Sequence, residues 1–253
     1  VTKDECKRCV LDALETGYRL IDTAQSYFNE EEVGQALAES GIPRRDIFLT
    51  TKVWVEHYGY EETKKSVYIS LEKLKTEYLD LMLLHQPFAD YYGAYRALED
   101  LYTEGVIRAI GVSNFYPDRL VDIANFARIV PMVNQVETHP LNQQTEAMKW
   151  MKKYDVQIEA WAPFGEGRGG LFENDVLAAI GKKYNKTAAQ VMLRWNLQRG
   201  VVVLPKSTHK ERMEQNFNVF DFSLTEEDMQ KITAMDTQTS AFFSHYDPNM
   251  VEW

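Results

Sequence analysis

Seven short apolar segments recur along the chain, and each ends in a polar or aromatic residue. They are Tyr18–Asp22, Ile47–Lys52, Leu79–His85, Ile107–Ser113, Val133–Gln135, Ile158–Trp161 and Val201–Lys206. Most run apolar without alternation, which is typical of strands buried on both faces in a parallel sheet covered by helices. Segments with helical periodicity separate them, so the pattern predicts strands and helices that alternate along the chain.

This alternation predicts an α/β protein, and in particular a (β/α)8 TIM barrel. In such a barrel the carboxyl ends of the strands meet at one mouth, where active sites are built. Residues far apart in the sequence would converge there, as in an enzyme. No linker or change in composition divides the chain, so we expect one domain over residues 1–253.

Composition and charge narrow the classes of partner. The chain is 45% hydrophobic and 26% charged, with a net charge of −10, which argues against a nucleic-acid partner. No apolar run approaches the ~18 residues of a membrane span, and no signal peptide is visible. Cys6 and Cys9 are the only cysteines. We interpret them as packing residues of a helix, and the lack of a disulfide framework indicates a cytoplasmic protein.

Four residues at the predicted mouth form a plausible proton-transfer group. Asp22, Lys52 and His85 end three strands, and Tyr27 follows Asp22 in the next loop. Tyrosine has an ordinary pKa of about 10, and a nearby ammonium lowers it by stabilising the phenolate. Asp22 would hold Lys52, and His85 would orient a substrate oxygen. The group suits proton donation to a carbonyl.

Several motifs resemble those of the aldo-keto reductase family, in the family's order. They are GYRLIDTAQSYFNEEEVG at 17–34, IFLTTKVW at 47–54, LLHQP at 83–87, IGVSNF at 110–115, LPKS at 204–207 and RMEQN at 212–216. The ending SHYDPNMVEW at 244–253 is similar to bacterial members of the diketogluconate-reductase and prostaglandin-F-synthase-like type. The match covers nearly the whole chain.

The resemblance implies an NADPH-dependent oxidoreductase that reduces an aldehyde or ketone to an alcohol by hydride transfer. It implies a tetrad of Asp22, Tyr27, Lys52 and His85, with Tyr27 as general acid. NADPH (NADP+) would lie extended across the mouth, with Trp161 stacked on the nicotinamide. The residues expected at the cofactor are Ser113, Asn114, Gln135, Trp161, Pro163, Phe164, Gly165, Gly167, Lys206, Ser207, Arg212, Gln215 and Asn216.

For two of the segments that contain expected cofactor residues, 165–170 and 206–212, the residues themselves allow an argument that does not depend on the resemblance. Residues 165–170, GEGRGG, satisfy G-x-G-x-x-G, but the next strand ends in Lys206 rather than in an acidic ribose ligand. We therefore interpret them as a loop that folds over the pyrophosphate, or as a plain surface turn. Lys206, Ser207 and Arg212 form a basic cluster in an acidic chain, which favours NADPH over NADH.

The substrate and the direction of the reaction stay open. Candidate pocket residues are aromatic: Trp54, Phe88, Tyr91, Phe242 and Phe243. Alternatives are a catalytically weak NADPH-binding regulatory or structural barrel, and another barrel enzyme such as a sugar-phosphate isomerase or hydrolase. The histidine spacing predicts no metal site. No interface stripe is visible, and together with the resemblance this favours a monomer.

One expectation concerns the start of the chain. A closed barrel needs eight strands, whereas seven are visible, because the chain opens in a helix near Lys3. The resemblance implies a capping hairpin and a first strand before that helix. We therefore expect the domain to be incomplete at its N-terminus, by roughly 25–40 residues.

Overall fold

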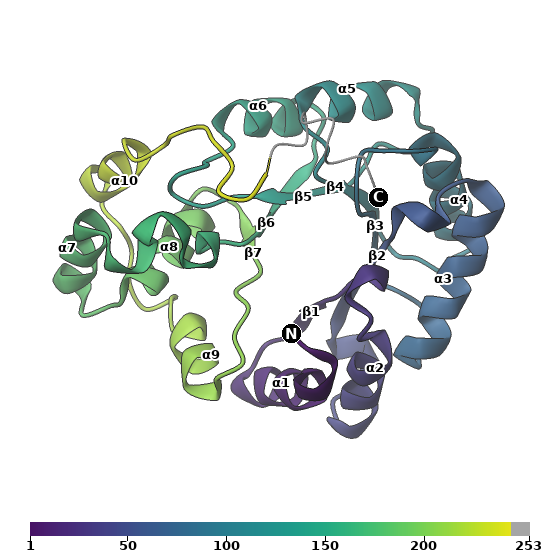
Figure 1. The fold of residues 1–253 in the computed structure, drawn as a ribbon, viewed down its shortest axis with the longest axis horizontal. Helices are drawn as coiled ribbons and strands as arrows, with labels where there is room; N and C mark the ends of the chain where they lie inside the picture. Colours follow the sequence, from purple (N-terminus) through teal and green to yellow (C-terminus); the bar gives the residue numbers. More distant parts are fainter. Residues whose placement is uncertain (244–253) are drawn as a thin grey trace.

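A computed structural model describes residues 1–243, which fold into a curled parallel sheet with helices on its outer side (Figure 1). Each strand pairs in parallel with the one before it, so the order is β1 to β7 in sequence. The strands are β1 Leu20–Asp22, β2 Phe48–Val53, β3 Leu81–Leu84, β4 Ile110–Ser113, β5 Val133–Glu137, β6 Gln157–Trp161 and β7 Val202–Val203. The predicted α/β class with a parallel sheet is confirmed.

Helices occupy the segments between the strands, as the periodicity predicts. They are α1 Lys3–Thr16, α2 Glu30–Glu39, α3 Tyr60–Leu74, α4 Tyr91–Thr103, α5 Pro117–Phe126, α6 Thr145–Lys153, α7 Asp175–Tyr184, α8 Ala188–Gln198, α9 Lys210–Phe217 and α10 Glu226–Thr233. Strand β7 is shorter than predicted. The Leu204 N–H still donates to Ala160 O, but Pro205 has no N–H to continue the ladder.

The curled sheet is open between β1 and β7 within residues 1–243 (Figure 1). On the outside α1 and α9 contact each other across this opening. Lys210 Nζ lies 2.8 Å from a Glu15 carboxylate oxygen, and the Tyr18 hydroxyl donates to Met213 O at 3.1 Å. The expected additional strand stays a prediction.

Two groups of buried apolar side chains stabilise this arrangement. The larger lies between the first six strands and the helices that cover them, and it includes Leu49, Met82 and Ile110, all fully buried. The smaller gathers side chains of α7, α8 and α10 with the loop after β6, around the fully buried Trp195. The second group makes the platform from which the loop after β6 and the segment after α10 extend.

Asp228 joins α10 to α7. Its carboxylate accepts hydrogen bonds from Lys183 Nζ at 2.5 Å, the Tyr184 hydroxyl at 2.6 Å and Thr225 Oγ1 at 3.0 Å. Burial by itself raises the pKa of Asp228, but these hydrogen bonds outweigh burial and lower the pKa to about 2. The carboxylate is therefore charged at neutral pH and anchors α10.

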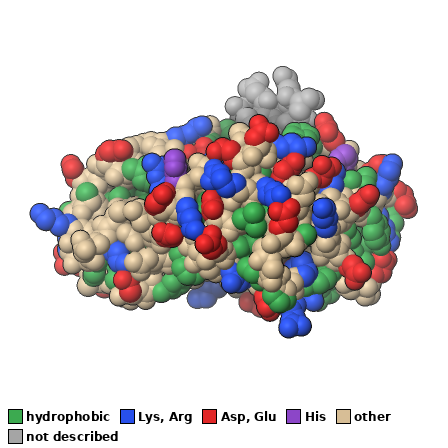
Figure 2. Space-filling model, turned by 90° about the horizontal axis from the view of Figure 1, so that it is seen from below, with side chains coloured by type: hydrophobic (Ala, Val, Ile, Leu, Met, Phe, Trp, Pro, Cys, Tyr) green, Lys and Arg blue, Asp and Glu red, His purple; other side chains and the backbone are tan. Residues whose placement is uncertain are grey.

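On the face seen in Figure 2, acidic and basic side chains are interspersed with isolated hydrophobic ones, so neither charge dominates this face. Within residues 1–243 no helix is long and apolar enough to cross a bilayer. The motif at 244–253 that resembles bacterial members lies outside the described residues.

Candidate active site

Lys52 and Asp22 form the buried base of the site. They lie at the carboxyl ends of adjacent strands β2 and β1. The Lys52 side chain is fully buried, and its Nζ donates to Asp22 Oδ1 at 2.5 Å and to Thr23 O at 3.0 Å. Burial by itself lowers the pKa of Lys52, but the Asp22 carboxylate, with Tyr27, outweighs burial and raises it. Lys52 is therefore a fixed ammonium.

Tyr27 and His85 lie above this ammonium. Tyr27 ends a short 3-10 turn, Gln25–Tyr27, and its side chain is 46% exposed. Lys52 Nζ lies 5.1 Å from the centre of the Tyr27 ring. The His85 ring, just after β3, lies edge-on 5.6 Å from the Tyr27 ring. The structure thus brings together the four residues predicted for proton transfer.

A second set of polar residues continues from the tetrad along β4, β5 and β6. Gln135 Nε2 donates to Asp22 Oδ2 at 2.9 Å, which links the tetrad to β5. Asn114 Nδ2 donates to His85 O at 3.1 Å, and Trp161 Nε1 donates to Asn114 Oδ1 at 2.8 Å. Ser113 Oγ donates to Gln135 O at 2.8 Å. The amides and the indole are therefore held in fixed orientations beside the proton-transfer group.

Glu159 on β6 is a residue that the sequence analysis missed. Its side chain is buried, and Oε2 accepts a hydrogen bond from Gln135 Nε2 at 2.8 Å. Burial, followed by the charge of Asp22, raises the pKa of Glu159 to about 7, while Gln135 and Lys52 oppose the shift. The sequence did carry a sign that Glu159 is special, because it places a carboxylate inside a strand predicted to be buried, Ile158–Trp161. Such a group needs a partner, because an unpaired buried charge is costly.

The basic cluster lies beside α9. Lys206, Ser207 and Arg212 precede or begin this helix, and Ser207 Oγ accepts from the His209 N–H at 3.1 Å. Within residues 1–243 neither Lys206 nor Arg212 forms an ion pair, whereas Lys210 pairs with Glu15. Two unpaired cations at a helix N-terminus are suited to a phosphate group.

One cavity of about 1340 Å³ joins the tetrad to the basic cluster. Asp22, Tyr27 and His85 line it, while Lys52 lies buried beneath. Of the residues predicted at the cofactor, eleven line it: Ser113, Asn114, Gln135, Trp161, Pro163, Phe164, Lys206, Ser207, Arg212, Gln215 and Asn216. A single ligand can therefore reach both the tetrad and the cations.

Gly165 and Gly167 do not line the cavity, although Glu166 between them does. The loop they belong to has positive φ at Gly165, Glu166, Gly167 and both following glycines of the segment, so it turns sharply. The sequential strand order excludes a doubly wound dinucleotide fold here. The role of this loop over a pyrophosphate stays a prediction.

The predicted substrate residues divide into two groups. Trp54 lies edge-on 5.2 Å from the His85 ring, and Phe242 lies 5.1 Å from the Trp161 ring, while Phe243 lines the cavity. Trp54 and Phe242 contact residues of the lining, His85 and Trp161, but are not themselves among the residues that line it, and neither is Phe88. The buried Tyr91 also lies away from the cavity. Its hydroxyl donates to Asp122 Oδ2 at 2.7 Å, and its ring packs on Phe115.

Within residues 1–243 no group of three His, Cys, Asp or Glu side chains is arranged to hold a metal ion. Cys6 and Cys9 are free and buried on the inner side of α1. Burial raises the pKa of both thiols, to about 11 for Cys6. A thiol in this state is a poor nucleophile.

Comparison with known proteins supplies the family. The aldo/keto reductase family model matches residues 1–237. The chain is 49% identical to a glyoxal reductase of Bacillus subtilis over 233 residues, 92% of this chain and 84% of that protein. It is also 49% identical over 230 residues to a 9,11-endoperoxide prostaglandin H2 reductase of Trypanosoma cruzi, 90% of this chain and 81% of that protein.

Solved structures agree with these relatives. An aldo-keto reductase from a deep-sea metagenome library is 45% identical and superposes with a TM-score of 0.95, covering 98% of this chain and 92% of that chain. An aldo-keto reductase of Bombyx mori in complex with NADP is 33% identical, with a TM-score of 0.92 over 96% of this chain and 86% of that chain. The similarity therefore extends over both the sheet and the cavity.

Proposed function

The chain belongs to the aldo/keto reductase family and is an NADPH-dependent oxidoreductase that reduces an aldehyde or ketone to an alcohol, and we propose that its substrates are small α-oxoaldehydes such as methylglyoxal. Two relatives are named for such substrates, the Bacillus subtilis glyoxal reductase and a methylglyoxal reductase of Escherichia coli that is 37% identical. Aromatic rings surround His85, so the polar groups offered to a substrate at this point are those of Tyr27 and His85. A compact carbonyl compound can be held by these two groups alone.

The observation that carries this function is the buried ammonium beneath Tyr27. When bound, the cofactor supplies the hydride. Tyr27 then donates its proton to the carbonyl oxygen as negative charge develops there. Lys52 Nζ, 5.1 Å from the ring centre, stabilises the phenolate that remains, and Asp22 keeps Lys52 charged and in place. His85 orients the carbonyl oxygen toward Tyr27.

The residues of the cavity fit a phosphorylated dinucleotide. Trp161 offers an aromatic face at the end of β6, and Asn114 and Gln135 offer amides for a carboxamide. Lys206 and Arg212 supply positive charge at the other end, and the absence of an ion pair within the described chain supports their binding of phosphate. We assign the 2′-phosphate to Arg212 because its planar fork matches phosphate oxygens.

The fold proposal goes further than the seven observed strands. We propose that residues 1–253 belong to one (β/α)8 barrel domain, in which an eighth strand lies between β1 and β7. Within residues 1–243 β1 and β7 each leave one edge unpaired, and this supports the proposal. An experimental structure of the protein in which β1 pairs directly with β7 would contradict it.

We also propose that the protein acts as a monomer in the cytoplasm. Its most exposed large apolar side chains are dispersed: Phe28 precedes α2, Phe126 ends α5 and Phe220 follows α9. Both cysteines are free, which suits a reducing compartment. Sedimentation velocity that gives a dimer at micromolar concentration would contradict the monomer.

The experiment is a substrate panel with purified protein, in which loss of reduced-cofactor absorbance is followed with methylglyoxal, glyoxal and an aromatic aldehyde. We expect turnover with NADPH and the highest kcat/KM for an α-oxoaldehyde. Turnover with the aromatic aldehyde alone would contradict the substrate class. NADPH binding without turnover of any aldehyde would instead support a regulatory barrel.

A further inference from the structure

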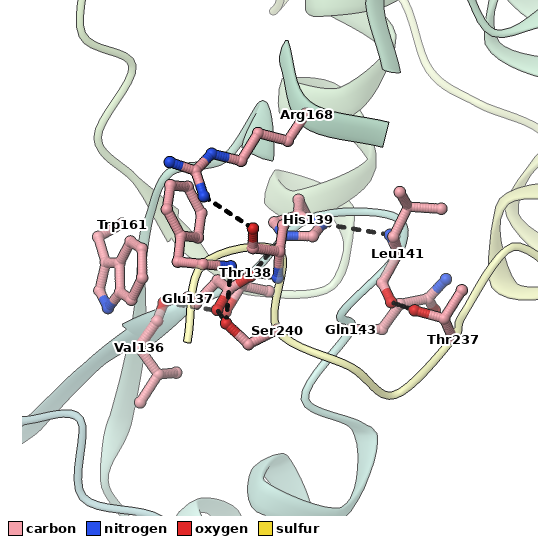
Figure 3. Close-up of polar contacts among 12 residues, drawn as sticks. Val136, Glu137, Thr138, His139, Leu141, Gln143, Trp161, Arg168, Thr237 and Ser240 are labelled. Atoms are coloured by element: carbon pink, nitrogen blue, oxygen red, sulfur yellow. Dashed lines mark hydrogen bonds and ion pairs between the residues drawn. The ribbon is translucent and has the colours of Figure 1, made fainter. Parts of the chain in front are cut away.

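The carboxylate of Glu137, at the carboxyl end of β5, is buried and receives three hydrogen bonds (Figure 3). His139 Nε2 donates to Oε1 at 2.7 Å, Ser240 Oγ donates to Oε2 at 2.5 Å, and the Ala241 N–H donates to Oε1 at 2.8 Å. His139 Nδ1 accepts from the Leu141 N–H, so Nε2 carries the donated proton. Glu137 therefore links β5 to a segment about a hundred residues away in sequence.

These contacts keep Glu137 ionised. Burial by itself raises the pKa of Glu137, but the hydrogen bonds from His139 and Ser240 outweigh burial and lower the pKa. Hydrogen bonds to a charged acceptor are stronger than those between neutral groups. The carboxylate thus acts as a firm anchor for Ser240 and Ala241.

The anchored segment carries Phe243, which lines the cavity, and Phe242, which contacts a residue of the cavity wall, Trp161. The N–H groups of Phe242 and Phe243 both donate to Ser240 Oγ at 3.1 Å. The Phe242 ring lies 5.1 Å from the Trp161 ring, and Phe243 lines the cavity. Ser240 is therefore the junction between Glu137 and both phenylalanines.

Arg168, in the loop after β6, also contacts residues 240–243 (Figure 3). Arg168 Nη1 donates to Ala241 O at 2.9 Å, and its guanidinium lies 4.3 Å above the Phe242 ring. Phe242 is thus held between Arg168 and Trp161, and Trp161 in turn donates to Asn114. A chain of contacts connects Glu137 to the part of the cavity beside the tetrad.

We propose that Glu137 is a positioning residue that sets the aromatic wall of the substrate pocket by fixing Ser240 and Ala241. It does not line the cavity, so it acts through Phe243, which does, and through Phe242, which packs against Trp161 of the lining. The proposal rests on the proposed carbonyl reduction at the tetrad. Its consequence is selective: a large aldehyde that touches the wall depends on Glu137, whereas a two- or three-carbon aldehyde held by Tyr27 and His85 does not.

Release of the anchor leaves the preceding turn in place. Thr237 donates through both its N–H and its Oγ1 to Leu141 O, at 2.9 and 2.7 Å. Asp236 Oδ1 accepts from the Gln143 N–H at 3.2 Å. Substitution at Glu137 or Ser240 therefore loosens residues 240–243, which still keep the contacts to Arg168 and Trp161 described above, without detaching residues 236–237.

The test compares E137Q and S240A with a control variant, T239A. The Thr239 hydroxyl that this control removes donates to Thr237 O, within its own turn. A glutamine offers one acceptor oxygen where three donors converge, and S240A removes one donor. We expect KM for an aromatic aldehyde to rise about tenfold in both variants, the effect of losing one hydrogen bond to a charged group. KM for methylglyoxal, kcat and the NADPH Kd should stay within about twofold, and T239A should match wild type.

Hydrogen–deuterium exchange supplies a readout that is independent of activity. Amides 240–243 should exchange faster in E137Q and S240A than in T239A, while β5 stays protected. An unchanged KM ratio between the two aldehydes, or an equal fall of kcat for both, would overturn the role of Glu137. Wild-type protein that oxidises NADPH with neither aldehyde would refute the proposed function instead.

Discussion

Glu159→Gln tests the electrostatics at the centre of the sheet. Glu159 lies buried near Asp22, which shares the Gln135 amide with it. Burial and the Asp22 charge raise the pKa of Glu159 from 4.5 to about 7. A glutamine has the same shape, can accept from Gln135 through its carbonyl oxygen, and carries no charge at any pH. The substitution therefore removes a titration while keeping the packing.

The sign of the effect follows from proton linkage. Between pH 4.5 and 7 the folded protein keeps a proton on Glu159 that the unfolded chain has lost, so ionisation makes wild-type stability fall as pH rises. The difference of about 2.5 pH units corresponds to roughly 3 kcal/mol once the group is ionised. We expect E159Q to unfold with a free energy up to roughly 3 kcal/mol higher than wild type at pH 8 and nearly equal at pH 4.5.

The assay is urea denaturation followed by tryptophan fluorescence at half-unit intervals from pH 4.5 to 8. Glu61→Gln, an exposed substitution on α3, is the matched control and should change the free energy by less than about 0.5 kcal/mol at every pH. A difference between E159Q and wild type that is the same at pH 4.5 and pH 8 would refute titration of Glu159 in this window. A variant less stable at pH 8 would show that the ionised carboxylate stabilises Lys52.

Three further substitutions test the tetrad, the basic cluster and the anchor of α10. Tyr27→Phe should lower kcat 10²–10⁴-fold, about the contribution of a general acid, with the NADPH Kd from fluorescence titration unchanged. Arg212→Ala should weaken NADPH by roughly 1.5–3 kcal/mol and NADH much less, since only NADPH carries the 2′-phosphate. Asp228→Asn should lower the free energy of unfolding at pH 7 by roughly 2 kcal/mol, from the depressed pKa, and this deficit should shrink as pH falls from 4 to 2.

Each of these has a control in the chain. Tyr68→Phe removes an exposed hydroxyl on α3 and should leave turnover intact. Arg119→Ala removes an exposed guanidinium on α5, away from the cavity, and should not distinguish the two cofactors. Glu227→Gln changes the exposed neighbour of Asp228 and should leave stability nearly unchanged. Near wild-type turnover in Tyr27→Phe, equal losses of both cofactors in Arg212→Ala, or a pH-independent deficit in Asp228→Asn would contradict the assignments.

The sequence by itself determined the alternation of elements and the residues that end each strand. Apolar runs that end in Asp22 and Lys52, with helical periodicity between them, predicted a parallel sheet and one shared edge. Parallel strands with helical crossovers bring their carboxyl ends together whatever the detailed packing, so the meeting of Asp22, Lys52 and His85 followed from local patterns. The family motifs supplied the cofactor and the reaction.

The tertiary structure decided which side chains meet at that edge and which turn away. Glu159 gains its raised pKa from burial and then from Asp22, which lies on a strand remote in sequence, and Glu137 gains its partner Ser240 across 103 positions. Tyr91, predicted at the pocket, bonds to Asp122 instead. Periodicity specifies the type of an element and its buried face. The partners of a buried polar group depend on register and rotamer, which are set by contacts between distant segments.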